Sequence, residues 1–60
     1  MKAFDLVITA HELRKKAECY RILASYVGDE HAASVIKYLA DQCDDRAVEL
    51  ERKVGRLHAA

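Results

Sequence analysis

Residues 10–27, AHELRKKAECYRILASYV, and residues 33–50, ASVIKYLADQCDDRAVEL, decide the fold of this chain. In both stretches alanine recurs every seven residues, at positions 10, 17 and 24 and at positions 33, 40 and 47. A larger apolar residue follows each alanine by three places. Such a heptad, with apolar residues at its a and d positions, is typical of helices in a left-handed bundle. The small residue at a predicts that the two helices approach closely.

The two repeats are mirror images of each other about Gly28 and Asp29. Folding the chain back there sets position 24 beside 33, 17 beside 40 and 10 beside 47. One register therefore satisfies every layer. We predict an all-α protein, an antiparallel helical hairpin that dimerises into a four-helix bundle. Its single domain, residues 1–60, would hold a helix over about 4–27, a turn at 28–29 and a second helix of similar length over about 30–57.

Several residues are candidates for the ends of these helices. Asp5 could cap the first helix, or Thr9 and Glu12 could form a capping box, although the apolar pattern favours a start near residues 3–5. Gly28 suits the left-handed position that ends a helix, and Asp29 suits the N-cap of the next one. Gly55 is unfavourable inside a helix, so we expect the second helix to stop or fray there.

A lone hairpin of 60 residues buries little apolar surface, so we expect self-association to complete its core. The predicted oligomer core comprises Leu6, Ala10, Leu13, Ala17, Tyr20, Ala24, Val27, Ala33, Ile36, Ala40, Cys43, Ala47, Leu50 and Val54. Leu23 and Leu39, at g positions, widen this stripe. The predicted partner surface lies off it, toward the turn, and comprises Ile22, Tyr26, Val35 and Tyr38. A looser apolar group, Val7, Ile8 and Val48, lies toward the other end. We leave open how two hairpins are oriented and whether more than two assemble.

Charge is balanced overall but not along the chain. Ten basic and ten acidic residues give a formal net charge of zero. Residues 1–27 carry five basic and three acidic residues, whereas residues 29–60 carry five basic and seven acidic ones. Opposite charges on the two helices favour their antiparallel pairing, weakly where they are exposed. Nothing here attracts the whole chain to nucleic acid or to a membrane.

Two cysteines bear on the compartment. Cys43 falls at a core d position and Cys19 at an outward c position, so the geometry of a disulfide is not met. Unpaired thiols are typical of a reducing compartment. No apolar run resembles a signal peptide or a membrane span. We therefore expect a cytoplasmic protein without a membrane partner.

A basic strip on the first helix offers an alternative function. His11, Arg14, Lys15 and Arg21, with Lys16 beside them, are the candidate RNA contacts. RNA binding needs several unpaired cations on one face. The simpler reading is that these residues pair across the hairpin with Asp41, Asp44 and Asp45, because residues 14–16 fall opposite residues 41–43. We favour the simpler reading.

Catalytic and metal motifs are incomplete. His11-Glu12 begins like the zinc-protease motif, but Lys15 stands where the second histidine belongs. Glu18, flanked by Arg14 and Arg21, fits a surface acid better than a ligand. A metal or redox protein that uses Glu18, the thiols Cys19 and Cys43, and the histidines His31 and His58 remains a second alternative. We expect no enzyme, no catalytic residues, no cofactor and no metal.

With its alanine seam, its Asp29-Glu30 turn and the cysteine in its second helix, the chain resembles in architecture the Rop family of plasmid copy-number proteins. That resemblance implies a two-helix hairpin, a dimeric four-helix bundle and RNA binding through the first helices. The run 39–46, LADQCDDR, with Glu18 and Tyr20, is similar to part of a ferritin-like bundle. Cys43 and Arg46 stand where that family has metal ligands, which argues against iron chemistry. The function we expect is a small non-enzymatic interaction or regulatory module that acts as a homo-oligomer, with an unidentified protein as a further partner.

Overall fold

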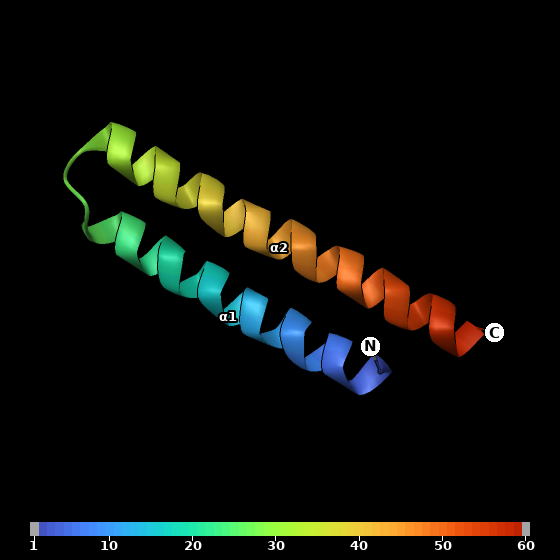
Figure 1. The fold of residues 1–60 in the computed structure, drawn as a ribbon. Helices are drawn as coiled ribbons and strands as arrows, with labels where there is room; N and C mark the ends of the chain where they lie inside the picture. Colours follow the sequence, from blue (N-terminus) through green and yellow to red (C-terminus); the bar gives the residue numbers. More distant parts are fainter. Residues whose placement is uncertain (1, 60) are drawn as a thin grey trace.

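The computed structural model describes residues 2–59, and the side chains of residues 2–57, as two helices. Helix α1 spans Ala3–Tyr26 and helix α2 spans Glu30–Ala59. The helices lie side by side and antiparallel, with the turn at one end and both termini at the other (Figure 1). No strand is present in residues 2–59. The prediction of an all-α helical hairpin is confirmed.

Helix α1 starts without a side-chain cap. Lys2 is its N-cap residue and makes no capping hydrogen bond with its side chain, while its carbonyl oxygen accepts a hydrogen bond from the Leu6 amide at 3.2 Å. Asp5 lies in the first turn, where its negative charge interacts favourably with the positive end of the helix dipole. Thr9 is an interior residue whose hydroxyl donates to the Asp5 carbonyl oxygen at 2.9 Å. The helix starts at Ala3, within the favoured range of residues 3–5, and Thr9 lies inside it as expected, so neither Asp5 nor Thr9 is the cap.

The turn closes without a left-handed residue. Val27 takes an extended conformation, with φ −83° and ψ 124°, and its amide donates to the carbonyl oxygen of Ala24 at 3.3 Å. Because Val27 already leads the chain out of the helix, Gly28 has no positive φ, and the left-handed conformation predicted for it is wrong. Asp29 does cap α2 as predicted, since its Oδ1 atom accepts from the His31 amide at 3.0 Å.

Helix α2 continues past Gly55 to Ala59, so a stop at Gly55 is also wrong. Glycine inside a helix lowers its stability by about 1 kcal/mol relative to alanine. This cost does not end the helix, because every added residue contributes a further backbone hydrogen bond. The helices consequently differ in length, 24 residues in α1 and 30 in α2. The end of α2 extends beyond the start of α1 (Figure 1).

The seam between the helices consists of the a and d positions of the heptad, counted with Ala10 at a. Most of its alanines are buried, and Ala17, Ala40 and Ala47 are 0% exposed, whereas Ala33, near the turn, is only half-buried. At the end of the hairpin that holds the termini, one buried cluster consists of Leu6, Ala10, Ala47 and Leu50, as the mirrored register requires. The remaining d positions of the hairpin overlap are only half-buried: Leu13, Tyr20, Val27, Ile36 and Cys43.

Candidate interaction surface

One long side of the hairpin is closed by ion pairs between the helices. The Nη2 atom of Arg21 lies 2.9 Å from Oδ1 of Asp41 and 2.7 Å from Oδ2 of Asp44. Arg14 makes a two-pronged contact with Glu51, in which its Nε atom donates to Oε2 at 3.4 Å and Nη2 donates to Oε1. Arg14, Arg21, Asp44 and Glu51 all occupy e positions, which face each other in an antiparallel pair. We call this the ion-pair side.

These contacts hold both guanidinium groups in their charged form. The hydrogen bond with Glu51, together with the negative charge of that carboxylate, raises the pKa of Arg14 above its ordinary value. Hydrogen bonds with Asp44 and then Asp41 raise the pKa of Arg21 in the same way. Both groups are open to solvent, so the ion pairs orient the helices more than they stabilise them.

The opposite long side carries the d, g and c positions, and we call it the open side. In the heptad, d is flanked by g, whereas a is flanked by e, so the half-buried d residues face away from the ion pairs. Leu23 and Leu39, at g positions, are 51% and 42% exposed. Among the side chains of residues 2–57, none of the ion pairs that join α1 to α2 lies on the open side.

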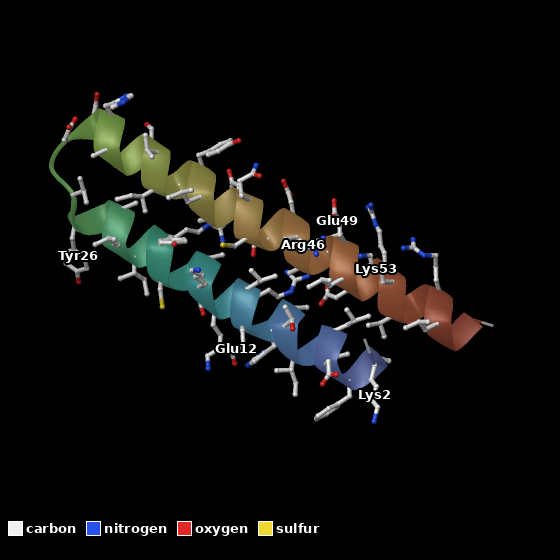
Figure 2. All side chains as sticks on the ribbon, in the orientation of Figure 1. Lys2, Glu12, Tyr26, Arg46, Glu49 and Lys53 are labelled. Atoms are coloured by element: carbon white, nitrogen blue, oxygen red, sulfur yellow. The ribbon has the colours of Figure 1, made fainter. Side chains whose placement is uncertain are left out.

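The open side is apolar near the turn and charged toward the termini. Its exposed apolar residues near the turn are Leu23, Tyr26, Val35 and Leu39. Figure 2 shows Tyr26 beside the turn, and Glu12, Arg46, Glu49 and Lys53 in the half toward the termini. Arg46 and Glu49 pair within α2, with Nη1 3.1 Å from Oε2. The surface thus changes character along its length.

All four residues of the predicted partner surface are exposed, but only two of them lie on the open side. Tyr26 and Val35 occupy c positions on the open side, next to Leu23 and Leu39. Ile22 and Tyr38 are also exposed but occupy f positions, which point away from the other helix. Leu23 and Leu39 were expected at the seam and not in the partner surface. Their g positions could have indicated this exposure, because a g residue is exposed wherever no helix covers the d residue beside it.

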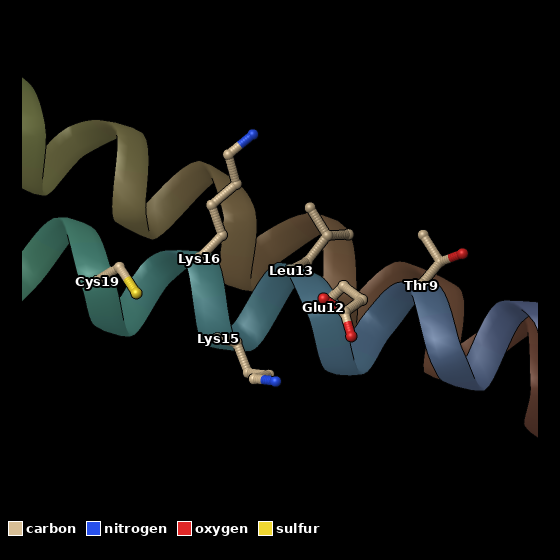
Figure 3. A pocket seen from close by; sticks show the side chains of 6 residues that line it. All are labelled: Thr9, Glu12, Leu13, Lys15, Lys16 and Cys19. Atoms are coloured by element: carbon tan, nitrogen blue, oxygen red, sulfur yellow. The ribbon is translucent and has the colours of Figure 1, made fainter.

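A surface hollow of 470 Å³ lies on the open side of α1 (Figure 3). Its walls are Thr9, Glu12, Leu13, Lys15, Lys16 and Cys19. All six come from one helix, so the hollow is a depression over Leu13 rather than an enclosed ligand pocket. A depression between successive side chains of a helix is the kind of hole that accepts a side chain from another helix.

The candidate RNA contacts do not form one free strip. Arg14 and Arg21 are engaged by acids of α2, which agrees with the predicted pairing of Arg21 with Asp41 and Asp44. Arg14 pairs with Glu51 rather than with the predicted acids, because its side chain reaches along α2 from one e position to another. Lys15 makes no ion pair with any side chain of residues 2–57, and the same holds for His11.

Both cysteines are free, Cys19 exposed and Cys43 half-buried, as their heptad positions predict. Within residues 2–57, no three side chains among His, Cys, Asp and Glu gather closely enough to hold a metal ion. Glu18 is exposed at a b position of α1, and His31 lies in the first turn of α2, where its amide donates to the cap residue Asp29. The side chain of His58 lies outside the described residues.

Comparisons with protein-family models, with curated proteins and with solved structures found no match. The resemblances to the Rop and ferritin-like families therefore rest on architecture alone. Neither described helix combines the length and the apolar character needed to span a membrane.

Proposed function

We propose that this chain is a small non-enzymatic interaction module whose hairpins associate through the open side into a homodimeric four-helix bundle. The observation that carries the proposal is the contrast between its two long sides. One is closed by Arg14 and Arg21, while the other leaves seam residues half-buried beneath exposed Leu23 and Leu39. A contiguous exposed apolar surface of this kind is typical of a protein–protein contact.

The size of the chain supports the same proposal. The two helices of residues 2–59 form a body with extents of 48 × 14 × 13 Å, in which no second layer of helices covers the seam. Domains of this length are marginal unless a disulfide, a metal or association adds to the core. Cys19 and Cys43 are not linked, so association is the remedy best matched to the chain.

The test compares two exposed apolar residues of nearly equal exposure on opposite sides. Leu23 on the open side is 51% exposed, and Val7, at an e position on the ion-pair side, is 49% exposed. We expect the unmodified chain to sediment as a dimer, Leu23→Glu to shift it to monomer, and Val7→Glu to leave it dimeric. Leu39→Glu is the second test variant, and far-UV circular dichroism checks that each variant remains helical.

Two results contradict the proposal. One is an unmodified chain that stays monomeric and cooperatively folded at every soluble concentration. The other is equal weakening of the dimer by Leu23→Glu and Val7→Glu, because the contact would then not be confined to the open side.

RNA binding is the less supported function. Its candidate contacts include Arg14 and Arg21, which already donate to acids of α2. A gel-shift titration with structured RNA at low and high salt separates the two functions, since electrostatic binding weakens steeply with salt.

A further inference from the structure

We propose that the second copy lies along the whole open side with its turn beside the first copy's turn, so that α1 of each chain packs against α2 of the other. This inference rests on the proposed function and adds the orientation and the contacts of the two copies. It is carried by the change from apolar to charged residues along the open side.

Most of the exposed apolar residues of the open side lie near the turn. Leu23 and Leu39 lie in the turn half, and Arg46 and Lys53 lie in the other half. With the turns together, apolar residues meet apolar residues. With one copy reversed, Leu23 and Leu39 would meet the charged half, and burying unpaired charges against apolar side chains is costly.

A stable dimer needs more buried area than the turn half of the open side provides. The long face of a body 48 Å by 14 Å projects roughly 670 Å², near the ~800 Å² that each partner contributes to a standard interface. The turn half alone provides about half of that area. The copies must therefore overlap along their full length, which brings the charged halves together as well.

With the turns together, the charged halves of the two copies place acids near bases. A two-fold axis parallel to the helices keeps every residue at its own height along the bundle. A residue of α1 is therefore level with the same α2 position in the partner as in its own hairpin, and the numbers of two level residues sum to about 57. Glu12 then lies level with Arg46 of the partner subunit, and the offset seen in the Arg14–Glu51 and Arg21–Asp44 pairs also directs Glu12 toward Lys53 of the partner subunit. Both are acid–base pairs between c and g positions.

In the same register, the remaining polar residues of the open side meet polar residues of the other copy, and the apolar residues meet apolar ones. Lys16 lies level with Gln42 of the partner subunit, which gives a polar contact. Leu23 lies level with Val35 of the partner subunit, and Cys19 with Leu39 of the partner subunit, which gives apolar contacts near the turn. The hollow over Leu13 is then covered by the partner's α2.

Spin labels at the two glycines measure the orientation directly. A Cβ atom at Gly28 or at Gly55 meets no other atom within 4 Å, so Gly28→Cys and Gly55→Cys are accommodated. Each is made in a Cys19→Ala/Cys43→Ala background, whose dimerisation is first checked by sedimentation. For the proposed dimer we expect a distance between labels at position 28 on the order of 20 Å, about two helix spacings. A reversed dimer separates those labels by nearly the 48 Å length of the molecule.

The outcomes separate the two proposals. A short distance between labels at position 28 supports the inference. A long distance there, with a short one between position 28 of one chain and position 55 of the other, overturns the inference and leaves the proposed function standing. A chain that remains monomeric overturns both.

Charge reversal tests the contacts themselves. Glu12→Arg should weaken the dimer about tenfold, the effect of turning two symmetric exposed ion pairs repulsive. Adding Arg46→Glu to the same chain should restore the affinity, because the pair reforms with its signs exchanged. Asp45→Arg, an acid at an outward f position, is the control and should have little effect. A double variant no tighter than Glu12→Arg alone would contradict the proposed register.

Discussion

Arg21 of α1 places its Nη2 atom 2.7 Å from Oδ2 of Asp44 on α2, and both residues occupy e positions of their heptads. This pair defines the side of the hairpin that α1 and α2 close between themselves. The half-buried d residues face the other way. The direction in which the seam opens thus follows from where these two charges meet.

Arg21→Gln should lower the melting temperature only slightly in low salt, because the pair is exposed to solvent. The difference from the unmodified chain should shrink in 1 M salt, where the screening length falls to about 3 Å. Thermal melts followed by circular dichroism at both salt concentrations measure it. A large loss that persists in high salt would show that Arg21 acts through packing instead.

The same pair should not weaken as the pH is raised from neutral to 9. Contact with Asp44 and Asp41 raises the pKa of Arg21, so its contribution to stability is present below the ordinary arginine pKa and is lost only above the raised value. That region lies beyond any practical buffer. Urea unfolding of the unmodified chain and of Arg21→Gln at both pH values should therefore give the same difference, and a difference that disappears by pH 9 contradicts the assignment.

Ala17→Leu should destabilise the hairpin by about 1–3 kcal/mol, the usual cost of overpacking a tight core. Ala17 is 0% exposed, and α2 leaves no room beside it for a larger side chain. Arg52→Leu, at an exposed f position, adds the same side chain away from the seam and is the control. Urea unfolding at one protein concentration compares them, and equal stability of the two variants would mean that the helices are not closely packed.

Asp29→Ala should cost about 1 kcal/mol, since it removes the acceptor of the His31 amide at the start of α2. Asp29→Asn keeps an acceptor oxygen in the same place and should retain most of the stability. The two free energies of unfolding, measured together, separate the hydrogen bond from the charge. If both variants lose the same amount, the charge of Asp29 matters more than its cap.

Gly55→Ala should stabilise the chain by up to about 1 kcal/mol, because Gly55 is helical and its added Cβ atom meets nothing. Gly28→Ala should be neutral or mildly stabilising, because Gly28 has no positive φ and the added methyl group only restricts the unfolded chain. Urea unfolding measures both. A loss of stability in Gly28→Ala would show that the turn uses a left-handed residue after all.

The hairpin itself could be predicted because two independent signals agree on it. The alanine repeat gives the helical phase, and its mirror symmetry about Gly28 and Asp29 gives the antiparallel register. The burial of Ala17 and Ala40, and of Leu6 beside Leu50, follows from phase and register together. No knowledge of side-chain conformation is needed for that step.

What sequence reasoning missed depends on side-chain reach and backbone detail. Arg14 was expected opposite residue 43 and is paired with Glu51, because side chains lean toward the N-terminus of their own helix, so that Arg14 and Glu51, on antiparallel helices, lean toward each other. The exit of α1 depends on the extended Val27, which no residue preference near Gly28 reveals. The candidate interaction surface includes Leu23 and Leu39 because the ion pairs close the other long side, and the place of those pairs depends on side-chain conformation.

The last turns of α2, past the level of Ala3, have no helix opposite them. Their amide hydrogens are bonded within the helix but have no neighbouring helix to protect them, so they should exchange with deuterated water faster than the amides in the middle of α2, around Ala40. The hairpin therefore opens from its free ends inward. A label or fused domain attached after residue 55 would disturb the least protected part of the molecule and leave its alanine-lined centre intact.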